Sequence, residues 1–242
     1  MNPSPSGATD YPIPRGRHVA PSRAIGRAAV TPSTAQQSLA DEFFYLAHDD
    51  RTGRPRLYSA AIAHGLAAAL LAELYREGRI TIDGRHVRVT NPRPPQDRLQ
   101  HLVDRLKAEG HTETRTWLAF VATSAYDLVA TRMSQLGLVR PRPSGLLRRG
   151  TWYVPTDTNV AAWPEGRLRL YLSRLMPLEH FDVALANLVL ATGLDTRVLQ
   201  FTPSDAHGFL AQQVTRADLP LRDLFKDLRT AVDSAVLSHR TS

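Results

Sequence analysis

The segment SAAIAHGLAAALLAELYREG, residues 59–78, constrains the fold more than any other part of this sequence. Its apolar residues occupy most of the circumference of an α-helix, and a helix that is apolar all round is buried by other elements. Gly78 is a natural C-terminal stop for such a helix. We therefore predict a buried helix that other parts of the chain must cover.

The flanking patterns predict a mostly α fold. Ile80 and Ile82 alternate with polar residues, as do Val87 and Val89, and the Asp-Gly pair between the two runs predicts a β-hairpin. Residues 138–155 are interpreted as a second hairpin. Apolar periodicity predicts further helices at 39–48, 98–110, 114–121, 125–137, 165–176, 180–193 and 221–239. No repeat or long linker divides residues 38–242, so we expect a single compact multi-helix domain with one or two β-hairpins.

Residues 1–37 differ from the rest of the chain. They contain six prolines and no apolar period, so they bury too little to offset the entropy of ordering. Four arginines against one aspartate give this stretch a net charge of +3. We predict a disordered basic arm, which is either a passive tail or touches an anionic surface.

Composition limits the function. The chain has no cysteine, which excludes disulfides, thiolate metal sites and a cysteine nucleophile. It has no apolar run long enough for a transmembrane helix and no signal-peptide pattern, so a cytoplasmic location is expected. The net charge is +7, and 28 of the 30 basic residues are arginines. This balance favours an anionic partner, or serves solubility alone.

Motifs for common enzyme chemistry are missing. There is no phosphate-binding loop, dinucleotide fingerprint, zinc-protease helix or nucleophile elbow. Asp49 and Asp50 follow His48, and adjacent carboxylates can bind a metal or act as an acid and a base. Arg51 and Arg54, however, are close enough to neutralise their charge. We expect no catalytic residue, metal or cofactor. Nucleic acid is not expected either, because the arginines are neither interleaved with aromatics nor aligned on one helix.

One stretch, AHDDRTGRPRLYSAAIAHGLAAALLAELYREGRITIDG, resembles the Golgi phosphoprotein 3 family. A helix ends in a D-R-x-G turn, an apolar helix with Gly-Leu near its middle follows, and an E-L-x-x-x-G-R-I segment enters a hairpin. The likeness continues through SQLGLV, where Gly137 ends a helix before the second hairpin, and it spans about residue 38 to the C-terminus. It is carried by Asp50, Arg51, Gly53, Gly65, Leu66, Glu73, Leu74, Gly78, Arg79 and Ile80.

The resemblance implies a mostly helical peripheral membrane protein, here of the bacterial type, at the inner face of a membrane. Eukaryotic members bind phosphatidylinositol 4-phosphate, insert an apolar hairpin into the bilayer and bind cytosolic tails of glycosyltransferases. We accordingly expect an anionic phospholipid membrane as partner, with tails of membrane proteins as further partners. The sequence does not indicate the oligomeric state.

The family's headgroup residues carry over only in part. The family tryptophan falls on Tyr58, the arginine after Gly-Leu falls on Ala67, and two further arginines fall near Thr123 and Tyr126. A phosphoinositide-like headgroup is therefore expected to bind through Tyr58 and nearby arginines, namely Arg54, Arg56 and Arg132.

The membrane hairpin of the family falls on RPRPSGLLRRGTWYVP. Leu146 and Leu147 stand at a Gly turn, flanked by Arg140, Arg142, Arg148 and Arg149. Burying two leucines contributes at most roughly 3–5 kcal/mol, and each arginine near an anionic surface adds about 1 kcal/mol. We predict a projecting hairpin with an apolar tip that enters the membrane; the alternative is that both leucines fold back onto the domain.

Two other functions stay open. The chain is either an enzyme or small-molecule binder that uses a helical cleft around Tyr58, His64 and Asp50, or a soluble scaffold that binds acidic segments through its arginines. His64 alone, on an apolar helix, is more typical of a core histidine. A cavity with converging polar groups would favour the small-molecule binder.

Overall fold

The computed structural model describes residues 38–84, 86–90, 99–109, 113–143 and 151–240. These residues belong to one compact unit, Ser33–Ser242. The predicted arm at 1–37 lies outside the described residues, and so do Leu146, Leu147, Arg148 and Arg149.

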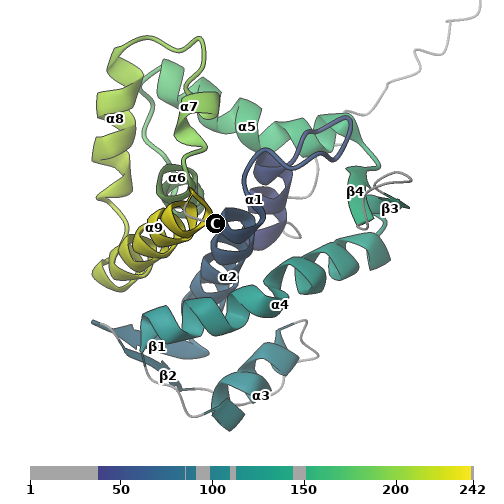
Figure 1. Cartoon of the computed structure of the whole chain (residues 1–242). Helices are drawn as coiled ribbons and strands as arrows, with labels where there is room; N and C mark the ends of the chain where they lie inside the picture. The colour runs from purple at the N-terminus through teal and green to yellow at the C-terminus, as the bar shows by residue number, and fades with distance from the viewer. Residues whose placement is uncertain (1–37, 85, 91–98, 110–112, 144–150, 241–242) are drawn as a thin grey trace, which may run out of the picture. The chain divides into compact units, whose positions relative to one another are not determined.

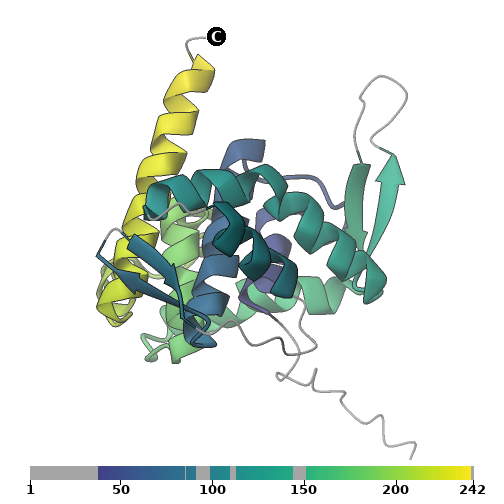
Figure 2. The same ribbon diagram turned by 90° about the horizontal axis from the view of Figure 1, so that it is seen from below.

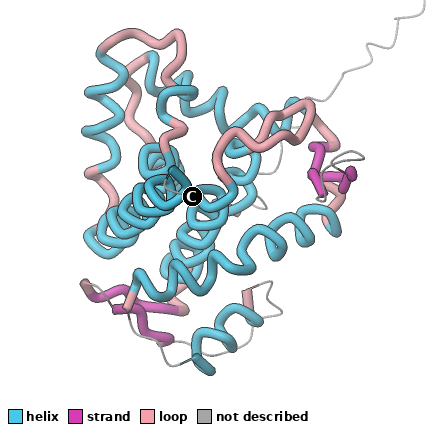
Figure 3. Tube along the Cα trace, in the orientation of Figure 1, coloured by secondary structure: helices cyan, strands magenta, loops and turns pink. Residues whose placement is uncertain are grey.

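The described chain is mostly helical, as predicted (Figures 1 and 3). The first half contains α1 (Leu39–Ala47), α2 (Ser59–Arg76), β1 (Ile80–Asp83), β2 (His86–Val89), α3 (Gln100–Glu109) and α4 (Thr114–Gln135). The second half contains β3 (Val139–Pro143), β4 (Thr151–Pro155), α5 (Thr158–Ser173), α6 (His180–Thr192), α7 (Asp195–Val198), α8 (Asp205–Val214) and α9 (Leu219–Arg240).

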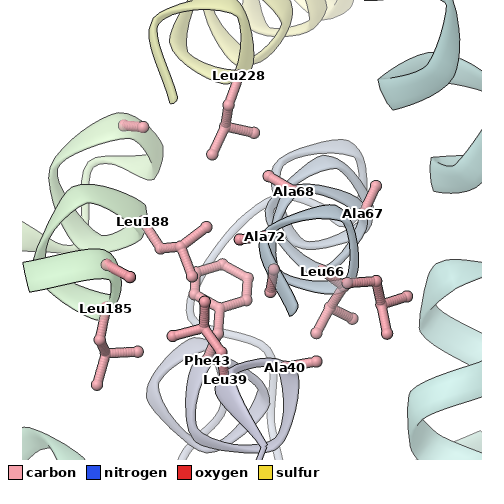
Figure 4. Close-up of a cluster of buried hydrophobic side chains, with 14 of the residues drawn as sticks. Leu39, Ala40, Phe43, Leu66, Ala67, Ala68, Ala72, Leu185, Leu188 and Leu228 are labelled. Atoms are coloured by element: carbon pink, nitrogen blue, oxygen red, sulfur yellow. The ribbon is translucent and has the colours of Figure 1, made fainter. Parts of the chain in front are cut away.

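The predicted buried helix is α2, and it lies at the centre of the fold. Helices α1, α4, α6 and α9 pack around it. Alanines on several sides of α2 have no exposed surface, and their small side chains let the neighbouring helices approach closely. Figure 4 shows Ala67, Ala68 and Ala72 on α2 among leucines from α6 and α9.

Gly65 allows the closest approach on α2. A Cβ atom at this position would lie 2.2 Å from Cζ of Phe43, a ring on α1 that has no exposed surface. The aromatic ring therefore occupies the space that any larger residue on α2 would need. This contact explains why a glycine stands in the middle of a helix, where it costs about 1 kcal/mol relative to alanine.

Both predicted hairpins are present, and they differ in burial. In the first, Ile80, Ile82 and Val87 pack into the core, while Thr81, Asp83 and His86 are exposed. In the second, Val139 is the only buried residue among those of β3 and β4. Figure 2 shows β3 and β4 standing away from the helical body, so the prediction of a projecting hairpin holds for its strands.

The structure differs from the predicted helices in the second half of the chain and in α4. The helices expected at 114–121 and 125–137 are one helix, α4, in which the hydroxyl of Thr123 donates to the carbonyl of Phe120, 2.7 Å away. Helix α5 begins at Thr158 rather than at 165, because the Asp157 side chain caps it and Pro164 lies within it. Helices α7 and α8 were not predicted.

Candidate functional site

Arg132 is held inside the molecule. Its Nη1 donates to Oδ2 of Asp41 at 3.0 Å, and its Nη2 donates to Oδ1 of Asp41 and to Oγ of Ser38. Asp41 has no exposed surface, and its carboxylate also closes a capping box with Ser38 at the start of α1. The guanidinium therefore neutralises a buried acid and ties α4 to α1.

Arg56 is also engaged by carboxylates. Its Nη1 lies 3.2 Å from Oε2 of Glu165, and its Nη2 lies 3.4 Å from Oδ1 of Asp50. The same Nη1 donates to the carbonyl of Leu46. These contacts attach the loop after α1 to α5, so the charge of Arg56 is largely compensated within the molecule.

The positions expected to form the headgroup site differ in exposure. Tyr58, at the start of α2, is 67% exposed. Ala67 is fully buried, so its position presents nothing to a ligand. Thr123 is exposed and Tyr126 is half-buried, and neither carries a charge. The structure thus leaves Tyr58 accessible, while two of the predicted cations, Arg56 and Arg132, pair with carboxylates.

The second hairpin places two further predicted arginines, Arg140 and Arg142, on the same strand. Arg142 pairs with Trp152 and Arg140 pairs with Val154 across the two strands. Residues that lie directly opposite in an antiparallel pair, and every second residue along each strand, share one face. Arg140, Arg142 and Trp152 therefore lie on one face of the hairpin, and both arginines are exposed.

Arg54 joins this face from the loop between α1 and α2. Its Cζ lies 5.4 Å from the centroid of the Trp152 ring, a cation–π distance. The loop reaches the hairpin at Gly53, which has a φ of 68°. A Cβ at Gly53 would lie 2.4 Å from the carbonyl oxygen of Tyr153, so only glycine allows this approach.

The opposite face of the hairpin is attached to the helical body by aromatic rings. The Tyr153 ring lies 6.1 Å from that of Tyr126 on α4 and 6.5 Å from that of Phe44 on α1. His48 completes this aromatic cluster, since its ring stacks on Phe44 at 4.2 Å. The cluster thus anchors the base of the hairpin and directs the arginine-bearing face outward.

His48 is neutral in this cluster. Burial lowers its pKa to about 4, and the nearby charge of Arg56 acts in the same direction. Its Nδ1 lies 2.7 Å from the carbonyl of Phe44 and must donate there, because a carbonyl can only accept. Nε2 is then an acceptor for the Tyr126 hydroxyl, 3.5 Å away, which keeps its proton because burial raises the pKa of Tyr126 to about 12.

We call Arg54, Arg140, Arg142 and Trp152 the basic face. Among the described residues, none of its three arginines forms an ion pair with a carboxylate. Sequence reasoning missed Trp152 as a member of this face. The alternation in TWYVP, which places Trp152 and Tyr153 on opposite sides of a strand, is the signal that would have found it.

Two residues of the cleft expected around Tyr58, His64 and Asp50 have partners within the molecule. Nδ1 of His64 donates to the carbonyl of Ala60 at 2.8 Å, as in a satisfied helix histidine, and Asp50 pairs with Arg56. A pocket of about 670 Å³ lies between the end of α2, β1, α6 and α9, and none of the three residues lines it. In the part of the chain described, no group of three or more His, Asp or Glu side chains is placed to hold a metal ion.

Comparison with known proteins agrees with this architecture. No helix in the described ranges combines the length and the apolarity needed to cross a bilayer. A search of curated proteins finds no match. A sequence model of the family described as Golgi phosphoprotein 3 (GPP34) matches residues 39–235, which is most of the 242-residue chain. The chain therefore belongs to the Golgi phosphoprotein 3 family.

Proposed function

We propose that this chain is a peripheral membrane protein that binds anionic lipid surfaces through the basic face of its second hairpin. Membership in the Golgi phosphoprotein 3 family supports a role in binding lipids or proteins. The observation that favours lipid is the basic face itself: three arginines without a described carboxylate partner gather around one tryptophan on a projecting hairpin.

The chemistry of this face suits a membrane surface. An arginine near an anionic bilayer contributes about 1 kcal/mol, so the three arginines together contribute roughly 3 kcal/mol before ordering costs. Tryptophan is favoured at the membrane–water interface. Residues 144–150, SGLLRRG, join the two strands and add two leucines and two arginines by sequence. An apolar and an electrostatic contribution together give reversible attachment.

Recognition should follow surface charge more than headgroup identity. Arg56 and Arg132 pair with carboxylates, and by the family resemblance the arginines of eukaryotic members fall on Ala67 and near Thr123 and Tyr126. A phosphoinositide would then bind because it is highly charged. The binding of membrane-protein tails, implied by the family resemblance, stays a prediction.

The test compares two double variants in liposome sedimentation. Arg140→Gln/Arg142→Gln removes two charges from the basic face, and we expect the partition coefficient on anionic vesicles to fall about 30-fold, equivalent to about 2 kcal/mol. Arg88→Gln/Arg174→Gln removes two exposed charges elsewhere and is the matched control. Parent binding should weaken as salt rises, because screening shortens the range of the charge. The proposal would be contradicted if both double variants lost the same affinity for anionic vesicles. It would also be contradicted if the parent bound neutral vesicles but not anionic ones.

A further inference from the structure

The pocket between α2, β1, α6 and α9 lies away from the basic face. Strand β1, which contributes to its lining, lies on the opposite side of the molecule from β3 and β4 (Figure 1). Its volume of about 670 Å³ falls within the range of sites that hold small molecules. A ligand here would not compete with a membrane for the basic face.

The floor of the pocket is apolar and firmly packed. Ile80 of β1, Val183 and Ala184 of α6, and Leu221 of α9 line it, and each belongs to the buried core. Because these side chains are held by the surrounding helices, the apolar surface is formed before any ligand arrives. Preformed apolar surface favours a ligand with an apolar body.

Two arginines line the same pocket. Nη1 of Arg216 donates to the carbonyl of Leu178 at 3.0 Å and to Oε1 of Gln213 at 2.7 Å, which fixes the guanidinium in place. The guanidinium of Arg76 lies over the ring of Phe181, with Cζ 5.6 Å from the centroid. Neither guanidinium forms an ion pair with a carboxylate among the residues that the structure describes.

The acid that lines the pocket already has a partner. The hydroxyl of Tyr75 donates to Oδ2 of Asp218 at 2.6 Å, and this hydrogen bond raises the pKa of Tyr75 to about 12. Arg76 and Arg216 therefore outnumber the one carboxylate, and the charged side chains of the lining sum to a net positive charge. An arginine fork binds a carboxylate through two parallel N–H groups.

We propose that this pocket binds a carboxylate attached to an apolar group, with the carboxylate on Arg76 and Arg216 and the apolar group over Ile80 and Val183. Such a group comes from two sources: the C-terminal residue of a polypeptide or a free aliphatic acid. The proposal is independent of lipid-surface binding, because it uses none of the residues of the basic face.

Calorimetric titration tests it with two probes of equal charge. N-acetylphenylalanine represents a peptide C-terminus and octanoate represents an aliphatic acid, and the tighter of the two identifies the source. N-acetylphenylalanine amide and octanol are the matched uncharged controls. We expect saturable binding of at least one acid and at least tenfold weaker binding of its uncharged control, because a charge-assisted hydrogen bond is lost.

Variants connect the binding to the two arginines. Arg76→Gln and Arg216→Gln should each weaken the acid about tenfold, whereas Arg229→Gln, an exposed arginine elsewhere on α9, should leave it unchanged. Arg76 makes no described hydrogen bond, so its variant remains informative if Arg216→Gln perturbs folding. Absence of saturable binding for both acids, equal binding of acid and control, or equal binding by all three variants would overturn the proposal. Arg140→Gln/Arg142→Gln should bind the acid as the parent does.

Discussion

Arginines in the helical body and arginines on the second hairpin have opposite surroundings. Arg167 on α5 lies between two buried acids: its Nη1 is 3.1 Å from Oε1 of Glu42, and its Nε is 2.9 Å from Oδ1 of Asp182. Arg140 and Arg142 on the hairpin face solvent and pair with no described carboxylate. The same side chain thus compensates buried charge in one region and presents charge outward in the other.

The difference follows from desolvation. Burial alone lowers the pKa of Arg167, but hydrogen bonds and charges from Glu42 and Asp182 outweigh it and raise the pKa above its usual value. A buried carboxylate in turn needs such a partner, since an unpaired charge in the interior is costly. On the hairpin no acid demands a partner, so the guanidinium groups stay available to an external anion.

The largest effect should come from Arg167→Met. Removal of this guanidinium leaves Glu42 and Asp182 buried without their partner, and we expect the free energy of unfolding to fall by about 3–5 kcal/mol. Urea denaturation measures it. The triple variant Arg167→Met/Glu42→Gln/Asp182→Asn removes the orphaned charges and should recover part of the loss. If Arg167→Met were as stable as the parent, the pairs of Arg167 with Glu42 and Asp182 would not stabilise the helical body. The contrast with the hairpin arginines would then fail.

Much of the fold could be predicted because local pattern and final environment agree. The apolar circumference of α2 and the Asp-Gly pair at the end of β1 each specify one structure. The failures arise where local signals and packing disagree. Pro164 argues against a helix, yet it lies in the second turn of α5 and is buried. The burial of Pro164 depends on packing against other parts of the chain, which the local sequence does not indicate.

The site was harder to predict than the fold. Arg54, Arg56 and Arg132 are equivalent in sequence, since each lies near the segments that resemble the family site. Only the structure shows that Arg132 meets Asp41, 91 residues away, and that Arg56 meets Glu165, 109 residues away. Neither acid carries a local signal for these pairings. The placement of Arg54 over Trp152 likewise depends on a contact between distant segments.

An intermediate effect is expected where the two regions meet, at His48. Its pKa is lowered from 6.5 to about 4, so the unfolded chain binds a proton more readily than the folded one. The stability contributed by the neutral ring is complete above pH 6.5 and is lost as pH falls toward 4. We expect a loss of about 2 kcal/mol between pH 7 and pH 5 from this residue.

His48→Phe keeps a ring in the stack and removes the titration. Urea denaturation of parent and variant at pH 7 and pH 5 isolates the contribution, because the other titratable groups are common to both. The parent should lose about 2 kcal/mol more than the variant over this interval. If the free energy of unfolding falls equally in the two proteins between pH 7 and pH 5, protonation of His48 does not destabilise the fold. The aromatic cluster would then not hold the hairpin rigidly.

The smallest effect should come from Arg54→Gln, and it tests whether position or total charge governs the basic face. Arg54 lies over Trp152, whereas Arg51, three residues earlier in the same exposed loop, has no described contact with that ring. Both variants lower the net charge by one.

If position matters, Arg54→Gln should weaken binding to anionic vesicles about fivefold, equivalent to about 1 kcal/mol, and Arg51→Gln should weaken it less. Both should change the free energy of unfolding by less than about 1 kcal/mol, since an exposed cation–π contact contributes no more than that. Equal weakening would show that the surface responds to net charge alone, and the contrast with the helical body would then rest on exposure and not on the arrangement around Trp152.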